Sequence, residues 1–266
     1  SLLKSARTNN DFSCMQLLNK QREYLTTNIP YHGLSILHNV PLTMSTVFKV
    51  EALALGGAIV TSFASNIIPP DPKAIDILEQ ANFRVVDKLP IAEQFDLHLD
   101  CCAEMLAVKP PQLGAVELTQ SGSIMYQNAK VNYPVISVDD SKLKVLETFF
   151  GTGEGFGRAL HAKIGDAKFD KPYVVFGHGK VGKGIVYSLQ NFSNDITVID
   201  LPSRFSREQG GLKYIDATDL DAVKKALAKS FAIITATGIR DLLTKYYNLA
   251  AQDCGDAILI NMGAED

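Results

Sequence analysis

Three glycines directly after an apolar run constrain the fold of this chain most. The run Tyr173–Phe176 is followed by Gly177, Gly179 and Gly182, and a helical pattern begins near Val181. In a strand–turn–helix unit, glycines at the spacing G-x-G-x-x-G allow a tight turn, close approach of a pyrophosphate to the backbone, and close packing of helix on strand. The N-terminus of the helix then directs its N–H groups and the positive end of its dipole at the phosphates. We therefore expect a dinucleotide to bind at this turn, through Gly177, His178, Gly179, Lys180, Val181 and Gly182.

An acidic residue ends the next apolar run, Ile196–Asp200. Asp200 lies close to the ~20-residue spacing at which a carboxylate binds the ribose hydroxyls of a dinucleotide. Because that carboxylate would repel a 2′-phosphate, we expect NAD rather than NADP. The nearby Arg204 and Arg207 leave NADP open as an alternative, and a structural turn without a ligand is the alternative to any nucleotide site.

A second glycine-rich segment, residues 151–157, competes for the same role. The residues before it do not form a bounded strand, and no acidic strand end follows at the right distance. We expect a hinge or an irregular helix start there instead.

Apolar runs alternate with helical patterns along most of the chain, which predicts parallel βαβ units. We expect an α/β protein of two domains. Residues 1–165 would form a substrate-type domain, and residues 166–266 a doubly wound, Rossmann-type domain with a parallel sheet. The sequence stops just past an apolar run, so we expect the second domain to lack the end of the common six-strand order.

The composition excludes several classes of protein. The net charge is −3 with Lys and Arg scattered, and no apolar run approaches the ~20 residues of a membrane span. We therefore expect neither nucleic acid nor a membrane as a partner. The cysteines, Cys14, Cys101, Cys102 and Cys254, include no C-x-x-C pair, which indicates no metal site and a reduced, cytoplasmic protein.

Residues 176–184, F-G-H-G-K-V-G-K-G, resemble the cofactor turn of the adenosylhomocysteinase family, which reads GYGDVGKG. The similarity extends to residues 133–142 (family PAINVNDSVTK), residues 235–238 (TATG for TTTG) and residues 261–263 (NMG for NIG). Residues 33–46 fit the family more weakly. The resemblance covers roughly residues 33–266 and is specific in its second half.

The resemblance implies tightly bound NAD that oxidises the 3′-hydroxyl of an adenosyl ribose before homocysteine is eliminated. Lys144 corresponds to the lysine that handles this hydroxyl, and Glu147 falls near its acidic partner. Residues three apart on a helix share a face, so these two can pair, and a solvated ion pair is the alternative. The family usually forms tetramers, which implies a homo-oligomer. The resemblance also implies cofactor contacts at Thr119, Thr237, Gly238, Asn261 and Gly263.

Other proton-handling positions of the family are replaced here. Histidines of the family fall on Pro41 and Ala264, an aspartate on Cys101 and a glutamate on Leu118. One lost general acid or base typically costs ~10²–10⁴-fold in rate. We therefore expect hydrolysis of S-adenosylhomocysteine to be lost, leaving at most hydride transfer on a nucleoside-type or small hydroxylated ligand. A non-catalytic dinucleotide-sensing or assembly module and another NAD-dependent dehydrogenase are the alternatives.

Three nearby groups could replace the lost ones. We expect His38 to be a satisfied strand-end histidine, and Asp100 and Glu117 to point away from the site, because a shift of one position reverses a strand side chain. Cys101 and Cys102 fit small buried hydrophobes better than a reactive thiol.

Overall fold

The computed structural model describes residues 15–65, 67–165, 170–205, 212–249 and 251–263. Cys14, Arg207 and Ala264 lie outside the described residues. Contacts divide the chain into a first unit, Ser1–Ser141, and a second unit, Lys142–Asp266. The sequence predicts a boundary at residue 165, whereas this division assigns helix α6 (Lys142–Ile164) to the second unit. The reason is burial, because Phe156 and Leu160 of α6 belong to the core of the second unit.

The first unit contains a six-stranded sheet in the order β3-β2-β1-β4-β5-β6, and every described pair in it is parallel. The direction of winding reverses between β1 and β4, so the carboxyl ends of these two strands form a switch point. The strands are β1 (Ser35–His38), β2 (Ile59–Phe63), β3 (Arg84–Val86), β4 (Leu97–Asp100), β5 (Gly114–Glu117) and β6 (Val135–Ser137).

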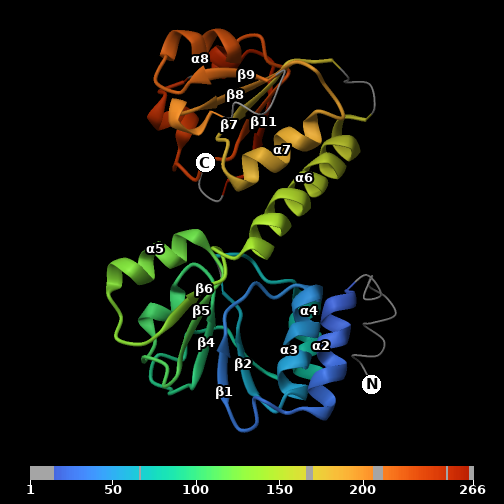
Figure 1. Ribbon diagram of the computed structural model, residues 1–266, viewed down its shortest axis with the longest axis vertical. Coiled ribbons are helices and arrows are strands. Elements are labelled where there is room, and N and C mark those ends of the chain that lie inside the picture. The colour runs from blue at the N-terminus through green and yellow to red at the C-terminus, as the bar shows by residue number, and fades with distance from the viewer. Residues whose placement is uncertain (1–14, 66, 166–169, 206–211, 250, 264–266) are drawn as a thin grey trace. The chain divides into compact units, whose positions relative to one another are not determined.

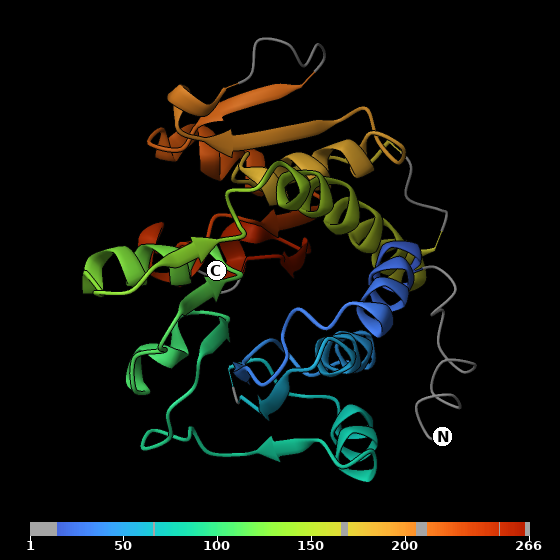
Figure 2. The same cartoon turned by 60° about the horizontal axis from the view of Figure 1, so that its bottom comes forward.

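Helices cover both faces of this sheet (Figure 1). On one face, α3 (Met44–Leu55) and α4 (Pro72–Gln80) pack Val47, Val50 and Leu78 against β1 and β2. Helix α2 (Gln16–Thr27) lies beside α3 in both views (Figures 1 and 2). The short helix η2 (Glu104–Ala107) and α5 (Gln120–Ala129) pack on the opposite face.

The second unit contains a five-stranded parallel sheet in the order β11-β10-β7-β8-β9. This is the order of the first five strands of a doubly wound sheet, and it confirms the predicted α/β, Rossmann-type class. The strands are β7 (Tyr173–Phe176), β8 (Ile196–Asp200), β9 (Lys213–Asp216), β10 (Ala232–Thr235) and β11 (Ile258–Asn261).

Alternating side chains of β7 supply two cores, as expected of a strand buried on both faces. Tyr173 and Val175 pack with α6 and α7 (Lys180–Leu189), whereas Val174 and Phe176 pack with α8 (Leu220–Leu227). The β7 strand is thereby fixed at the centre of the sheet, and the turn that follows it emerges at the carboxyl edge.

Glycines let α6 and α7 touch backbone to backbone. The two helices lie side by side in both views (Figures 1 and 2). A Cβ on Gly153 would lie 2.4 Å from the carbonyl oxygen of Gly184, and one on Gly184 would lie 2.2 Å from that of Phe149. The prediction of a hinge or irregular start at residues 151–157 is therefore wrong, because α6 is continuous and its glycines serve packing.

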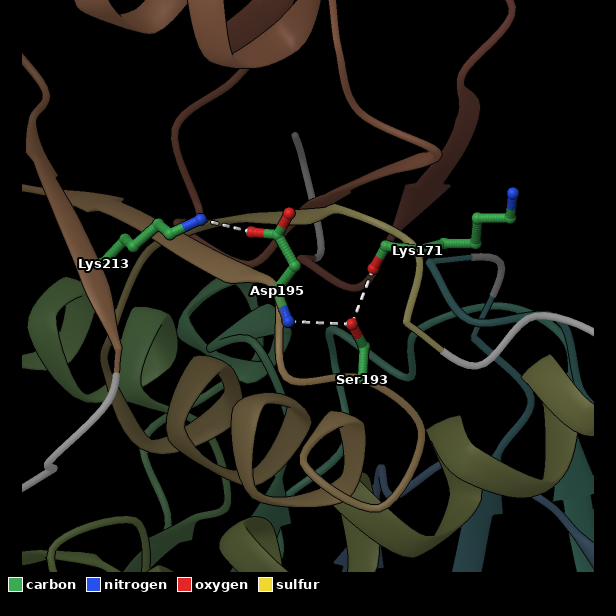
Figure 3. Close-up of polar contacts among 4 residues, drawn as sticks. All are labelled: Lys171, Ser193, Asp195 and Lys213. Atoms are coloured by element: carbon green, nitrogen blue, oxygen red, sulfur yellow. Dashed lines mark hydrogen bonds and ion pairs between the residues drawn. The ribbon is translucent and has the colours of Figure 1, made fainter.

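Polar contacts tie the strands together at their amino ends (Figure 3). The Ser193 hydroxyl donates to the carbonyl oxygen of Lys171 at 2.6 Å and accepts the N–H of Asp195 at 2.9 Å. Asp195 in turn accepts Lys213 Nζ at 2.7 Å. These contacts link the starts of β7, β8 and β9 at the edge opposite the glycine turn.

Candidate functional site

The glycine turn lies where β7 meets β10, at the switch point of the second sheet. Gly177 has a φ of +91°, and a Cβ there would lie 2.6 Å from the carbonyl oxygen of Ala236. A Cβ on Gly182 would lie 1.9 Å from the carbonyl oxygen of Gly177. These two glycines therefore serve the tight turn and the close packing of helix on strand, as their spacing predicts.

Gly179 differs from the other two glycines of the turn because its surroundings are open. Apart from its neighbours in the chain, the one described residue within 4 Å of a Cβ placed on Gly179 is Arg204, whose Nη1 lies at 4.0 Å. Helix α7 begins directly afterwards, at Lys180, and Gly179 provides no side-chain cap for its N-terminus. A helix N-terminus beside open space at a switch point is an arrangement that accepts phosphate groups.

Asp200 lies against the glycine turn. Its Oδ2 accepts the N–H of His178 at 2.6 Å, and its Oδ1 accepts the N–H of Leu201 at 2.7 Å. The carboxylate is buried, and each oxygen has a second lone pair with which to accept a hydroxyl. The His178 ring packs against Tyr214, with the ring centres 5.6 Å apart, and its backbone N–H is donated to Asp200, so His178 connects the turn to the end of β8.

The other predicted cofactor residues of this unit follow β10 and β11. Thr237 lies beside Gly177, with its Cγ2 3.2 Å from a Cβ placed there, and Gly238 has a φ of +71°. Asn261 Oδ1 accepts the N–H of Gly263 at 2.9 Å. Thus Thr237 is brought to the glycine turn, whereas Asn261 and Gly263 stabilise each other beyond the end of β11.

Lys144 and Glu147 form the ion pair that their spacing predicts. Lys144 Nζ lies 3.0 Å from Glu147 Oε2 in the first turns of α6. The Glu147 side chain is 61% exposed and that of Lys144 is 25% exposed, so solvent screens the pair. Their catalytic role remains a prediction.

Thr119 belongs to the first unit, where it caps α5. Its hydroxyl oxygen accepts the N–H of Gly122 at 3.1 Å and its hydroxyl proton is directed at Glu117 Oε1, 2.6 Å away. The hydroxyl group of Thr119 is thus used both as a hydrogen-bond donor and as an acceptor within the first unit.

A small cavity lies at the switch point of the first unit, and we call it the switch-point cavity. Pro41 and Cys101 line it together, so two positions at which the resemblance places proton-handling groups are neighbours in the fold. Neither side chain is an ordinary general base. The cavity is lined by Asn39, Pro41, Ser65, Ile67, Ile68, Cys101, Cys102 and Glu104.

Asp100 and Glu117 face each other in neighbouring strands and hold the turn after β4. Asp100 accepts the backbone N–H groups of Cys101 and Met105, at 2.8 and 3.0 Å, and the Tyr126 hydroxyl at 2.6 Å. Glu117 accepts the N–H groups of Cys102 and Ala103, at 3.2 and 3.1 Å. Both carboxylates are fully buried, and neither lines the cavity.

The expectation that His38 is a satisfied histidine is wrong. Its ring is fully buried, and within the described part of the chain neither ring nitrogen has a hydrogen-bond partner. Burial, and then the charge of Lys49, lower the pKa of His38 well below its usual value. His38 is therefore neutral at pH 7.

Sequence reasoning missed Lys49. This residue lies on α3 among apolar core residues, and burial lowers the pKa of its ammonium group to about 8, against the attraction of Cys101. In the sequence, only its place in an otherwise apolar helical stretch could have indicated burial.

Two structural findings concern membranes and metals. Among the described helices, none combines the length and the apolar character that crossing a bilayer requires. Within the same residues, His, Cys, Asp and Glu side chains form no group of three or more that could hold a metal ion.

The amino-acid sequence of this chain is similar to those of adenosylhomocysteinases and of an S-inosyl-L-homocysteine hydrolase. The adenosylhomocysteinase of Sulfurisphaera tokodaii is 28% identical over 279 residues, covering 94% of this chain and 64% of the relative. That of Thermotoga maritima is 25% identical over 275 residues, covering 94% and 67%. The S-inosyl-L-homocysteine hydrolase of Methanopyrus kandleri is 24% identical over 279 residues, covering 95% and 64%. The resemblance to adenosylhomocysteinases is thus confirmed, for a chain that spans about two thirds of their length. No protein-family model matches the chain.

Solved structures support the fold alone. A dipicolinate synthase of Bacillus halodurans has a TM-score of 0.55 at 11% identity, covering 89% of this chain and 85% of that one. A 2-hydroxyacid dehydrogenase of Ketogulonicigenium vulgare has a TM-score of 0.50 at 12% identity, covering 88% and 75%.

Proposed function

We propose that this chain is an adenosylhomocysteinase-like protein that binds NAD in its second unit. The supporting observation is the glycine turn itself. Gly177 and Gly182 pack without room for a Cβ, Gly179 faces open space, and Asp200 contacts the same turn through His178. A dinucleotide requires these features at a switch point.

The residues present fit the cofactor. The backbone at Gly179 and the start of α7 would hold the pyrophosphate, and Asp200 would accept the adenosine ribose hydroxyls with its remaining lone pairs. When bound, NAD supplies a hydride acceptor. Lys144, in its neutral form and next to Glu147, would take the proton of a substrate hydroxyl as the hydride leaves the same carbon.

The proposed chemistry stops at alcohol–ketone hydride transfer on a nucleoside-type or small hydroxylated ligand. Elimination of a thiol from that ligand needs further acids and bases. In the switch-point cavity Pro41 and Cys101 stand at two such positions. The nearby carboxylates of Asp100 and Glu117 are engaged by the turn, and Glu104 in the cavity lining accepts the Asn39 amide at 3.0 Å.

We expect NAD to stabilise the protein more than NADP does. Asp200 is buried at the place of the ribose hydroxyls, where its charge repels a 2′-phosphate. The thermal midpoint should rise by several degrees at 100 times the dissociation constant, which corresponds to about 2.7 kcal/mol. Asp200→Asn should reduce the preference for NAD at least tenfold, because it removes the charge and keeps one acceptor oxygen. Equal shifts with NAD and NADP in the unsubstituted protein would contradict the role of Asp200.

A non-catalytic dinucleotide-binding module is the second candidate, favoured by Pro41 and Cys101. Incubation with S-adenosylhomocysteine, and separately with adenosine, distinguishes the two candidates. We expect NADH absorbance without release of homocysteine. Release of homocysteine would establish complete hydrolysis of S-adenosylhomocysteine. If NAD binds but neither NADH absorbance nor homocysteine appears, the result would favour the non-catalytic module.

A further inference from the structure

We propose that Cys101 and Cys102 form a redox-active vicinal dithiol at the switch-point cavity, which exchanges with small, uncharged disulfides. Cys102 is the attacking thiol and Cys101 the resolving thiol. The proposal concerns the first unit and does not depend on NAD binding in the second.

The two sulfur atoms are already close together. Their Sγ atoms lie 3.8 Å apart, and both side chains line the switch-point cavity. The cavity volume of about 10 Å³ holds about one water molecule, so a disulfide would reach the exposed part of Cys102 rather than enter the cavity. Cys102 is half-buried and Cys101 is buried. A disulfide bond is ~2.05 Å long, so closure requires the sulfurs to approach by roughly 1.8 Å. Because consecutive Cα atoms are closer together than those of ordinary disulfides, the bond between these adjacent cysteines is strained, which makes it readily reducible.

The backbone that carries the thiols is held in a costly conformation. Cys102 and Ala103 have φ angles of +62° and +54°, a region that costs a non-glycine residue about 1–2 kcal/mol. Asp100 and Glu117 fix this turn through four backbone N–H groups, those of Cys101, Cys102, Ala103 and Met105. Strain that the surrounding structure maintains in this way is concentrated at functional sites.

The surroundings make the two thiols unequal. The two thiols share a hydrogen bond, and with Cys101 as its donor this bond lowers the pKa of Cys102 to about 7 and raises the pKa of Cys101. The groups around the pair are Asp100 and Glu117 from the strands, Glu104 from η2 and Lys49 from α3. The negative charge of Glu117 destabilises the Cys102 thiolate, so hydrogen bonding is what stabilises it. The carboxylates around the pair also repel disulfides that carry negative charge.

The exchange conserves atoms and electrons. The Cys102 thiolate attacks one sulfur of the small disulfide, forms a mixed disulfide and releases one thiolate. Cys101 then loses its proton to that thiolate and attacks the Cys102 sulfur. The second small thiol leaves, and a Cys101–Cys102 disulfide remains. Two protein thiols are oxidised and one external disulfide is reduced to two thiols.

The test uses the full chain with Cys14→Ser and Cys254→Ser, so that only the pair remains. With bis(2-hydroxyethyl) disulfide, intact mass should show the loss of two hydrogens and no adduct, reversed by dithiothreitol. Adding Cys101→Ser should instead trap one adduct on Cys102. Adding Cys102→Ser should slow the reaction at least tenfold. Cys102→Gly also removes the attacking thiol and should slow the reaction equally, and glycine adopts the left-handed backbone of this position without strain.

Each outcome decides the proposal. Urea-unfolded protein serves as the control in which both thiols react as ordinary thiols. Two stable adducts on the folded pair, equal rates for the two single variants, or no faster reaction than in urea would each overturn the assignment.

Alkylation gives an independent pH readout. In a Cys101→Ala variant the main hydrogen-bond donor to Cys102 is removed, so we expect its iodoacetamide reaction to have a higher midpoint than that of the intact pair. The intact pair should show a midpoint near pH 7, because thiolate persists at a lower pH than for an ordinary thiol of pKa ~8.5. A midpoint near 8.5 in both proteins would count against the attacking role of Cys102.

Discussion

Gly179→Val is expected to abolish NAD binding while leaving the fold intact. Gly179 has a φ of −74° and a ψ of −161°, which valine also adopts, and apart from its neighbours in the chain its Cβ position meets no described residue closer than Arg204, whose Nη1 lies at 4.0 Å. A valine side chain would instead occupy the space proposed for the pyrophosphate. We expect the dissociation constant for NAD to rise at least 100-fold, about 2.7 kcal/mol, by isothermal titration calorimetry.

Two controls make this result specific. The thermal midpoint of Gly179→Val without ligand should stay within about 2 °C of the unsubstituted protein, since no packing is lost. Gly182→Ala should lower that midpoint strongly, because its Cβ would lie 1.9 Å from the Gly177 carbonyl oxygen. Full NAD affinity in Gly179→Val would refute the proposed pyrophosphate site.

The second large effect is a contrast between two glycines on α6. Gly153→Ala places a methyl group 2.4 Å from the carbonyl oxygen of Gly184. This oxygen belongs to the backbone of α7 and cannot move aside as the end of a flexible side chain can. We expect a loss of about 3 kcal/mol in the free energy of unfolding of the second unit, at the upper end of overpacking costs. Gly155→Ala meets no described atom within 4 Å and should gain about 0.5–1 kcal/mol from helix propensity.

Urea denaturation followed by circular dichroism measures both variants. The matched pair removes helix propensity as an explanation, because the same substitution is made two residues away on the same helix. Equal stabilities for Gly153→Ala and Gly155→Ala would show that the α6–α7 contact tolerates a Cβ.

The sequence predicts the second unit well because its information is local. Gly177, Gly179, Gly182 and Asp200 specify a strand, a turn and a helix within one short segment, and the structure brings Asp200 to the turn. The predicted helices in the first unit are likewise amphipathic or capped, as Asp71 caps α4 through the N–H of Lys73 at 2.9 Å.

Features set by tertiary contacts are not readable in the same way. The strands β3 (Arg84–Val86) and β9 (Lys213–Asp216) lie at the edges of their sheets and are only partly buried, so neither is a continuous apolar run, and their pairing depends on distant neighbours. The π-helical stretch Leu242–Tyr246 does not follow the 3.6-residue period by which a sequence indicates an α-helix. The glycines of α6 suggest a hinge or an irregular helix start until the partner helix is known.

The candidate site of the first unit shows the same limit. Asp100 and Glu117 resemble replacement catalytic groups in the sequence, and only their hydrogen bonds to the turn reveal their structural role. Lys49 and His38 lack any motif, and their altered pKa values arise from burial by residues far along the chain.

The all-parallel pairing of both sheets has a consequence for how the protein must be produced. The central strand β1 pairs with β4, so Ile36 pairs with Leu97, a residue far away in the sequence, and the segment between them includes α3 and α4. Such a high contact order predicts slow folding, on the millisecond-to-second scale, with hydrophobic strands exposed to aggregation in the meantime. Protein recovered from inclusion bodies should therefore give lower yields of active material than protein synthesised at low temperature with chaperones.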